Sequence, residues 1–292
     1  MNAPPRVSVV VPTRDRPAAL ERCLAALARQ SAPSIELIVV DDGSRNATGV
    51  PAVVTRAAPS ARIVRGAGAG PAAARNRGAR AARGDVICFT DDDCAPEPRW
   101  AQLLADACSG GGAAAGTTVA DPLAGRGAAA SQLLTHLLQV TSLDPTSGGL
   151  VFAPTCNIAC SVPLVRELPF DESFPYAAGE DRDWCARLAR ASVVLRFVPE
   201  AIVSHRPQLG LRGLLRQQRR YGRGAVRFRA AGEGRALAGR AFYARLAREA
   251  GAAGAPIAAL VVLAQAAVAT GALAELAAPP RDRGRRPAGR AG

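Results

Sequence analysis

Apolar residues are spread unevenly along the first ninety positions, where short unbroken apolar runs alternate with stretches of helical spacing. The runs rich in Val and Ile have the length of strands buried on both faces, and they lie at residues 6–12, 35–40, 61–65 and 85–90. The stretches with helical spacing lie at residues 17–30 and 71–83. This order of elements predicts an α/β fold built on a mainly parallel sheet.

The pattern is looser beyond residue 100. It indicates a strand near Thr117 and a helix over 131–140, followed much later by a strand over 193–198. Residues 180–190 predict a clear helix, because their apolar positions share one face and their acidic residues lie in the first turn.

The last third of the chain has a different composition, and it divides the sequence into four segments. We expect a catalytic α/β domain, a basic amphipathic helical segment, an apolar helix and a basic disordered tail, over residues 1–206, 207–249, 250–278 and 279–292. The apolar helix is long enough to span a bilayer. It is Ala-rich, however, and a single span would place the Arg-rich tail outside the cell, against the positive-inside tendency. We therefore expect peripheral association with an anionic membrane surface.

The net charge of the chain is large, but it is weak evidence about binding partners. The formal charge is +13, but every basic residue is Arg, and a coding bias toward Arg, Ala, Gly and Pro would produce the same excess. Acidic residues after two strands argue against nucleic acid as a partner at that edge. The seven cysteines form no metal-ligand pairs and indicate buried thiols in a reducing compartment. A strand pattern begins within about six residues of Met1 and leaves no room for a signal peptide, so we expect a cytoplasmic catalytic domain at the inner face of the membrane.

Polar residues follow three of the predicted strands at the point where each strand ends. They are Thr13 to Arg16, Asp41 to Ser44, and Asp91 to Asp93. Ligands of open α/β sheets bind beyond the carboxyl ends of the strands, so these residues are candidates for a binding site. Turn formers are common after strands, but five aspartates after two strands exceed what turns alone require.

Five strings in fixed order extend this argument: VVVPTRDRP, IVVDDGS, GPAAARNRGA, CFTDDDC and GEDRDW. Together they resemble the family 2 glycosyltransferases, which have the GT-A fold, a Rossmann-like catalytic domain. The resemblance covers about residues 6–206. It implies transfer of a sugar from a nucleotide-diphosphate donor, and it does not indicate which sugar or acceptor.

The resemblance also implies a metal site. Asp91, Asp92 and Asp93 match the family's D-x-D element, with an additional aspartate inside it. By this match Asp93 binds the metal and Asp91 lies toward the ribose and the metal. Carboxylate oxygens suit Mn²⁺ or Mg²⁺, and a cation offsets the repulsion among three adjacent carboxylates. His205 follows a strand at a position where some family members supply a metal ligand; a satisfied structural histidine is the alternative.

The remaining donor contacts are implied by position within the motifs. Asp42 corresponds to the family aspartate that binds the base, while Asp41 and Ser44 are donor contacts or turn formers. The other candidates are Thr13, Arg16, Arg75, Asn76, Asp92 and Arg220. Arg220 lies in QQRRY, which resembles the Q-x-x-R-W element of processive polysaccharide synthases, and it is a candidate phosphate or acceptor contact.

Inverting sugar transfer requires one carboxylate to accept the proton of the acceptor hydroxyl, while a metal stabilises the departing diphosphate. In GEDRDW the resemblance assigns the base to Asp181, with Glu180 as the alternative.

The sequence thus predicts an inverting, metal-dependent hexosyltransferase that uses a UDP- or GDP-sugar and a hydroxyl acceptor, with a lipid-linked acceptor as one option. Its setting would be cell-envelope polysaccharide, glycolipid or secondary-metabolite assembly. A nucleotidyltransferase is one alternative, although PTRDRP lacks the glycine-rich, lysine-bearing loop expected of that class. A non-catalytic basic protein that binds membranes or nucleic acid on a degenerate transferase scaffold is the other alternative.

Overall fold

The computed structural model describes residues 7–32, 34–174, 177–230 and 239–278. The strands within these residues are β1 (Val7–Thr13), β2 (Ile35–Asp41), β3 (Arg62–Arg65), β4 (Val86–Phe89), β5 (Cys94–Pro96), β6 (Ala113–Ala120), β7 (Ile158–Ser161) and β8 (Leu195–His205). The helices are α1 (Pro17–Leu27), α2 (Gly49–Ala57), α3 (Pro71–Ala81), α4 (Trp100–Ala107), α5 (Arg126–Val140), α6 (Val162–Glu167), α7 (Glu180–Arg190), α8 (Leu211–Ala230), α9 (Arg240–Ala252) and α10 (Ala255–Leu276).

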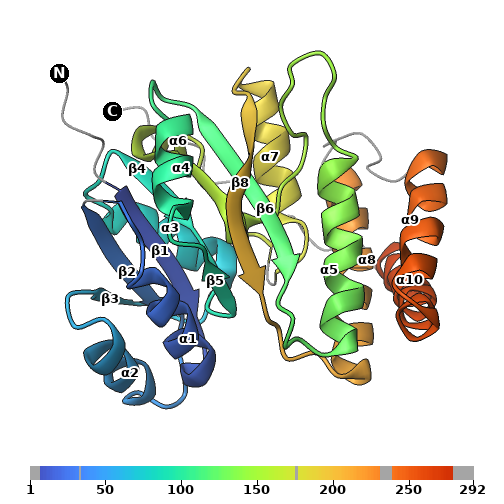
Figure 1. The fold of residues 1–292 in the computed structure, drawn as a ribbon, viewed down its shortest axis with the longest axis horizontal. Helices are drawn as coiled ribbons and strands as arrows, with labels where there is room; N and C mark the ends of the chain where they lie inside the picture. The colour runs from blue at the N-terminus through green and yellow to red at the C-terminus, as the bar shows by residue number, and fades with distance from the viewer. Residues whose placement is uncertain (1–6, 33, 175–176, 231–238, 279–292) are drawn as a thin grey trace.

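The strands form one sheet in the order β3-β2-β1-β4-β7-β6-β8-β5. Strands β1 to β4 pair in parallel, as do β6 and β8, whereas β7 and β5 run antiparallel to their neighbours. Helices cover the sheet, and α5, α8, α9 and α10 stand together beyond β6 and β8 at one end of the molecule (Figure 1). The α/β fold with a helical C-terminal portion agrees with the sequence prediction.

β1 lies inside the sheet because its β-branched residues can be buried on both faces. All seven of its residues are buried. Val9 belongs to the apolar cluster on one face of the sheet, and Val10 to the cluster on the other. On the second face Gly78 of α3 touches Val10 so closely that a Cβ at position 78 would overlap the valine side chain. This contact seats α3, and with it Arg75 and Asn76, directly on the sheet.

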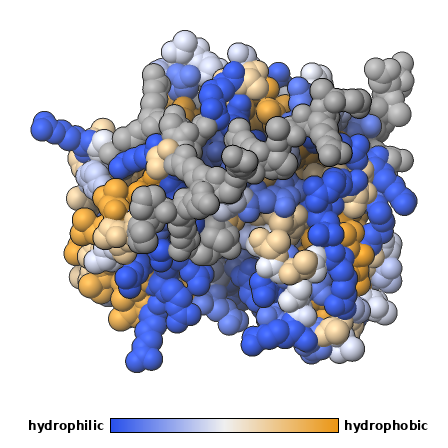
Figure 2. Space-filling view, turned by 180° about the vertical axis from the view of Figure 1, so that it is seen from behind, coloured by the Kyte–Doolittle hydropathy of each residue, from blue (hydrophilic) through white to orange (hydrophobic). Residues whose placement is uncertain are grey.

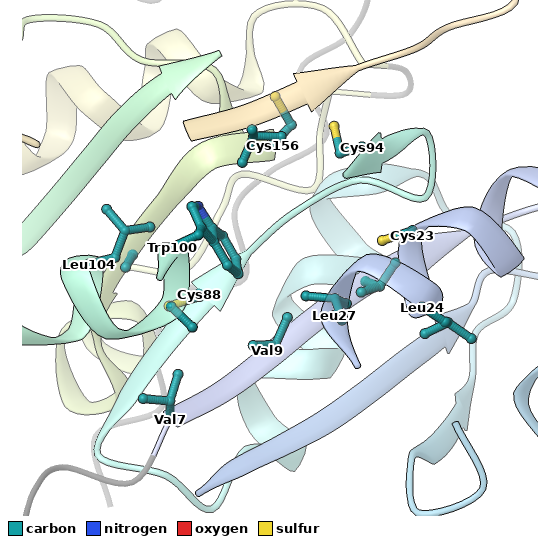
Figure 3. Packing of buried hydrophobic residues seen from close by; sticks show 14 of the residues in the cluster. Val7, Val9, Cys23, Leu24, Leu27, Cys88, Cys94, Trp100, Leu104 and Cys156 are labelled. Atoms are coloured by element: carbon teal, nitrogen blue, oxygen red, sulfur yellow. The ribbon is translucent and has the colours of Figure 1, made fainter. Parts of the chain in front are cut away.

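The first apolar cluster packs α1 and α4 against β1 and β4. Figure 3 shows Leu27 of α1 and Trp100 of α4 lying near Val9 and Cys88 of the sheet. Trp100 is fully buried, and its indole nitrogen donates to Oδ1 of Asn157 at 2.8 Å. All seven cysteines are buried and free, as the sequence indicated. The edge of the sheet that carries the polar residues therefore rests on a rigid apolar base.

Several elements were not predicted from the sequence. They are α2, α4, α6, β5 and β7. The strands β5 and β7 have only three and four residues, too few to show a period. In α2 the run of valines reads as a strand, although Pro51 in the first turn is compatible with a helix.

A third apolar cluster unites α5 with the three last helices. Leu134 and Leu137 of α5 pack with Leu214, Phe242 and Val261 of α8, α9 and α10. Strand β8 ends at His205, next to the expected boundary at residue 206, and α5, which lies before that boundary, packs with the C-terminal helices. The predicted apolar helix is α10, and the predicted tail at 279–292 lies outside the described residues.

The contact between α8 and α10 is unusually close. A Cβ at Gly222 would overlap the backbone of Val268, and a Cβ at Gly271 would overlap the backbone of Arg219. Glu275 of α10 accepts hydrogen bonds from Arg223 and Arg227 of α8 at 2.7 and 2.6 Å. Small residues allow the two helices to approach, and the two ion pairs fix their register. We call this contact the α8–α10 seam.

Candidate active site

The carboxyl ends of β1, β2 and β4 meet at one edge of the sheet. Thr13 pairs in register with Asp41, and its hydroxyl donates to Oδ2 of Asp92 at 2.6 Å. The structure thus brings together three of the segments that the sequence marked as strand ends. Parallel pairing makes this meeting unavoidable, since all three strands point the same way.

Asp92 is fully buried, and through its contact with Thr13 it links β1 to the acidic turn, which we define as Asp91 to Asp93. Arg16 lies 2.7 Å from its Oδ1 and 2.8 Å from Oδ2 of Asp93. Burial raises the pKa of Asp92 to about 7, although the charge of Arg16 opposes the shift. The Arg16 side chain is 52% exposed, so its guanidinium balances the carboxylates from the solvent side.

Asp93 and His205 come from distant parts of the sequence but lie side by side. Antiparallel pairing of β5 with β8 sets Cys94 opposite His205, and the N–H of Arg206 donates to the carbonyl of Asp93 at 2.8 Å. Nε2 of His205 is then 3.4 Å from Oδ1 of Asp93. Burial opposes both charges, but the hydrogen bond and mutual attraction lower the pKa of Asp93 to about 2 and raise that of His205 to about 9.

The donor atoms of Asp93, Cys94 and His205 all lie within 4.8 Å of one another. A carboxylate and an imidazole fit Mn²⁺ or Mg²⁺ better than a thiol does. Burial raises the pKa of Cys94 well above its usual value, so it stays a neutral thiol. The residues present therefore fit a divalent cation held by Asp93 and His205.

Gln132 of α5 orients this histidine, and the sequence gave no signal for it. Its Oε1 lies 3.0 Å from Nδ1 of His205, and its amide nitrogen donates to the carbonyl of Thr118 at 2.8 Å. Because Gln132 is held by β6, its Oε1 can accept a hydrogen bond from Nδ1 of His205, and Nε2 is directed toward Asp93. A second hydrogen bond of this kind is usual for metal-binding histidines.

Asp42 organises the glycine-rich loop that precedes α3. Its carboxylate accepts the N–H groups of Gly68, Ala69 and Gly70 at 3.1, 3.2 and 2.8 Å. The loop is drawn so close that a Cβ at Gly66 would lie 2.7 Å from Oδ1 of Asp42. The candidate base-binding aspartate is thus also the anchor of this loop. The neighbouring Asp41 is fully buried and accepts the N–H of Ser44, a turn contact.

Arg75 joins the acidic turn to the start of α7. It is buried, and it donates to Oδ1 of Asp91 and to Oε1 of Glu180, both at 3.0 Å. Although burial opposes the charge, these two carboxylates raise its pKa. The side chain of Asn76 has other partners. Its amide oxygen accepts the backbone N–H of Phe170, and its amide nitrogen donates to the carbonyl of Phe170 and to the carboxylate of Glu172. In this structure Asn76 therefore holds the Phe170 segment, while Arg75 lies within the site.

Glu180 and Asp181 begin α7, whose observed bounds match the predicted ones. Glu180 is buried; Arg75 holds its Oε1, and its Oε2 has no hydrogen-bond partner among the described residues. Burial, followed by repulsion from Asp181, raises the pKa of Glu180 to about 7. Burial also raises the pKa of Asp181, which is partly exposed and accepts only the N–H of Arg182 among the hydrogen bonds of the described residues.

A cavity of about 240 Å³ lies beside these groups. Asp91, Glu180, Asp181 and His205 contribute to its wall, and side chains of α5, α8, α9 and α10 complete it. The candidate Arg220 is exposed on α8 and does not line the cavity, whereas the adjacent Tyr221 does.

Comparison with known proteins identifies the kind of molecule that has this fold and site. The family model described as glycosyl transferase family 2 matches residues 8–167, and the model described as glycosyl transferase family group 2 matches residues 91–278. The chain therefore belongs to glycosyl transferase family 2.

Curated relatives agree with this assignment. The pre-mycofactocin glycosyltransferase of Mycobacterium tuberculosis is 30% identical over 231 residues, which cover 75% of this chain and 47% of that protein. The glycosyltransferase AglE of Haloferax volcanii is 27% identical over 230 residues, covering 76% of this chain and 73% of AglE. The chain thus spans about half the length of the first of these relatives.

Solved structures share the GT-A fold. The mannosyltransferase PcManGT from Pyrobaculum calidifontis, in complex with GDP-Man and Mn²⁺, superposes with a TM-score of 0.60 at 21% identity, covering 94% of this chain and 88% of that one. The glucosyl-3-phosphoglycerate synthase of Mycobacterium tuberculosis, in complex with Mn²⁺, UDP and glucosyl-3-phosphoglycerate, superposes with a TM-score of 0.58 at 19% identity, covering 80% of this chain and 82% of that one.

Proposed function

We propose that this glycosyltransferase is an inverting, metal-dependent enzyme that moves a hexose from a UDP- or GDP-sugar to a hydroxyl acceptor. The observation that carries the proposal is the placement of Asp181 and His205 on the wall of one cavity, with Asp93 in contact with His205. Two solved relatives that hold Mn²⁺ with GDP-Man or UDP support the donor class.

The donor would lie along the edge formed by Thr13, Asp42 and Asp91. Asp93 and His205 would hold Mn²⁺ or Mg²⁺, which supplies positive charge for the departing diphosphate. Arg16 has a half-exposed guanidinium beside Asp93, from which it can reach a phosphate oxygen. These groups would bind the diphosphate and offset the charge that develops on it.

Asp181 would act as the base. It lines the cavity, and no arginine side chain among the described residues forms an ion pair with it. Glu180 is more deeply buried and is held by Arg75, so we assign it the role of keeping Arg75 and Asp91 in place, with direct proton transfer as the alternative. The bond from the acceptor oxygen to the anomeric carbon forms as the bond to the diphosphate breaks, and the acceptor proton passes to Asp181.

A donor panel tests this proposal. Incubation of the full chain with UDP- and GDP-hexoses and Mn²⁺ is expected to release the matching nucleotide diphosphate, and a chelator is expected to stop the release. Release of hexose 1-phosphate instead, with the nucleotide monophosphate joined to an acceptor, would indicate nucleotidyl transfer. Absence of any Mn²⁺-dependent binding of UDP or GDP would overturn the proposal.

We also propose that the enzyme is peripheral at the cytoplasmic face of a membrane, with α10 as the contact. Within the described residues α10 is the one helix that is long and apolar enough to cross a membrane. Val262, Leu273 and Leu276 are 68%, 65% and 69% exposed. Their separations of about three and four helical turns place them on one face. The α8–α10 seam on the opposite side favours a helix that lies against the bilayer.

The positive charge of arginines on the neighbouring helices α8 and α9 favours an anionic lipid surface as the partner of the exposed face of α10. Exposed arginines of α8 and α9 include Arg212, Arg216, Arg219, Arg220, Arg240 and Arg248. Figure 2, seen from behind, shows apolar atoms along the edge of the molecule where the C-terminal helices lie, with hydrophilic atoms beside them. This combination suits a layer of acyl chains under anionic headgroups.

We expect the full chain to sediment with vesicles that contain phosphatidylglycerol, and much less with pure phosphatidylcholine vesicles or at high salt. Leu273→Glu is expected to weaken this binding about tenfold, because it places a charge in the acyl region. Leu123→Glu, at a leucine that is 73% exposed outside the C-terminal helices, is the matched control. Equal effects of the two changes would contradict a role for α10.

A further inference from the structure

The cavity beside Asp181 is lined by two kinds of surface. One wall consists of reaction-site groups: Asp91, Glu180, Asp181 and His205. The other wall comes from the C-terminal helical layer and α5, where Leu134, Leu138, Ala225, Phe242 and Val268 form an apolar surface beside polar side chains such as Gln218 and Gln265. A ligand that fills this space therefore has a polar end and an apolar end.

The cavity overlaps the expected nucleotide site only in part. Thr13, Arg16, Asp42 and Asp92, which lie at or beside the ends of β1, β2 and β4, are absent from its wall. Asp91 and His205 are shared, and they lie where the acidic turn meets β8. The cavity thus begins where the donor's reacting end is expected and continues away from the nucleotide, which is the position an acceptor must occupy.

The helical wall also carries polar side chains, and those of Ser131, Gln132, Thr135 and Gln218 are already engaged in hydrogen bonds within the protein. Gln218 is buried and donates to Ser131 at 3.2 Å. A sugar ring placed against Leu134, Leu138 and Val268 would lose hydrogen bonds to water without replacing them, and this loss is unfavourable. An apolar group in the same place gains from the removal of its surface from water.

The size of the cavity limits the apolar group. A cavity of about 150 Å³ in another protein holds one benzene molecule. The 240 Å³ available here must also admit the acceptor's hydroxyl-bearing part near Asp181. The space therefore suits one ring, or an alkyl segment of similar volume.

We propose that the acceptor is an amphiphile whose hydroxyl faces Asp181 and whose apolar group, about one ring in size, lies between α5, α8, α9 and α10. This proposal rests on the sugar transfer proposed above and adds the class of acceptor. The C-terminal helices then have a direct role in acceptor selection, besides any contact with a membrane.

A matched pair of probes tests the proposal on the full chain. Phenyl β-glucoside and methyl β-glucoside present the same hydroxyl groups and differ in one apolar ring. With Mn²⁺ and UDP or GDP present, saturation-transfer NMR titrations are expected to show the phenyl compound binding at least tenfold more tightly. Ala225→Leu, which adds three carbon atoms to the cavity wall, is expected to remove most of that difference. Ala247→Leu, the same change at an exposed position of α9, is expected to preserve it.

Leu138→Ala provides a second test that does not depend on filling the cavity. It widens the same wall, and we expect it to favour naphthyl β-glucoside over phenyl β-glucoside. Equal binding of the methyl and phenyl compounds, binding of neither, or no response to either cavity substitution would overturn the acceptor assignment. Mn²⁺-dependent binding of UDP or GDP is measured in the same samples, so a failure of the donor proposal is detected separately.

Discussion

Asp181→Asn is expected to lower turnover by about 100-fold or more while the affinity for the nucleotide-sugar stays within about twofold. Asparagine keeps the shape of the side chain and still accepts the N–H of Arg182, but it cannot take a proton. A positioned general base contributes roughly that factor to the rate. Turnover and donor affinity measured on the same variant separate the two effects.

Asp183→Asn on the same helix is the control. Asp183 is buried and lies 2.8 Å from Arg187, so its substitution is expected to reduce stability more than turnover. Near-normal turnover in Asp181→Asn would exclude Asp181 as the base. Lost donor affinity would make it a donor ligand, and Glu180→Gln would then be the next variant to examine.

The carboxylates of Glu180 and Asp181 also predict how the rate depends on pH. The base must be ionised, and burial raises the pKa of both groups, to about 7 for Glu180. Because the pKa of Asp181 is raised by burial, turnover should begin to fall at a higher pH than the one at which an ordinary carboxylate is protonated. In Asp181→Asn this limb of the profile is expected to shift, because Glu180 loses the negative neighbour that raises its pKa.

Asp93→Ala is expected to abolish Mn²⁺-dependent binding of UDP or GDP, lowering the affinity by about 100-fold or more. The substitution removes the carboxylate ligand and leaves His205 as the remaining member of the pair. His205→Ala is expected to have a milder effect, since a carboxylate contributes charge that a neutral imidazole does not. Calorimetric titration of nucleotide with and without Mn²⁺ measures both changes.

Asp106→Ala, at an exposed position on α4, is the control for removing a carboxylate far from the site. Binding of nucleotide to Asp93→Ala with an unchanged Mn²⁺ requirement would refute the metal assignment. If His205→Ala were indistinguishable from the parent across a Mn²⁺ titration, His205 would be structural, held by Gln132 on one side and by Asp93 on the other.

Local pattern was sufficient to predict the strands β1, β2 and β4, whose carboxyl ends carry Thr13, Asp42 and the aspartates that follow Phe89. A run of β-branched residues ended by polar ones identifies a buried strand and its carboxyl end, so the meeting of Thr13, Asp42 and Asp92 follows from parallel pairing alone. The helix at Glu180–Arg190 could also be predicted, because its apolar face and its acidic first turn are both visible in the local sequence.

Other features depend on tertiary contacts and left no local signal. Gln132 is one polar residue within a helix, and only the packing of α5 on β6 reveals that it orients His205. The two hydrogen bonds of Asn76 to the backbone of Phe170 bridge a separation of 94 residues. In the sequence Leu134 and Phe242 look like ordinary core residues, and only the fold shows that both line the same cavity.

The α8–α10 seam constrains how this chain can change. Any side chain added at Gly222 or at Gly271 would collide with backbone atoms of the other helix, and a backbone cannot move aside as a side chain can. The same two helices carry Tyr221, Ala225 and Val268 into the cavity wall. On the acceptor assignment proposed above, random variation is expected to alter acceptor preference mainly through the cavity residues while the two glycines stay fixed, and libraries aimed at new acceptors should hold positions 222 and 271 constant.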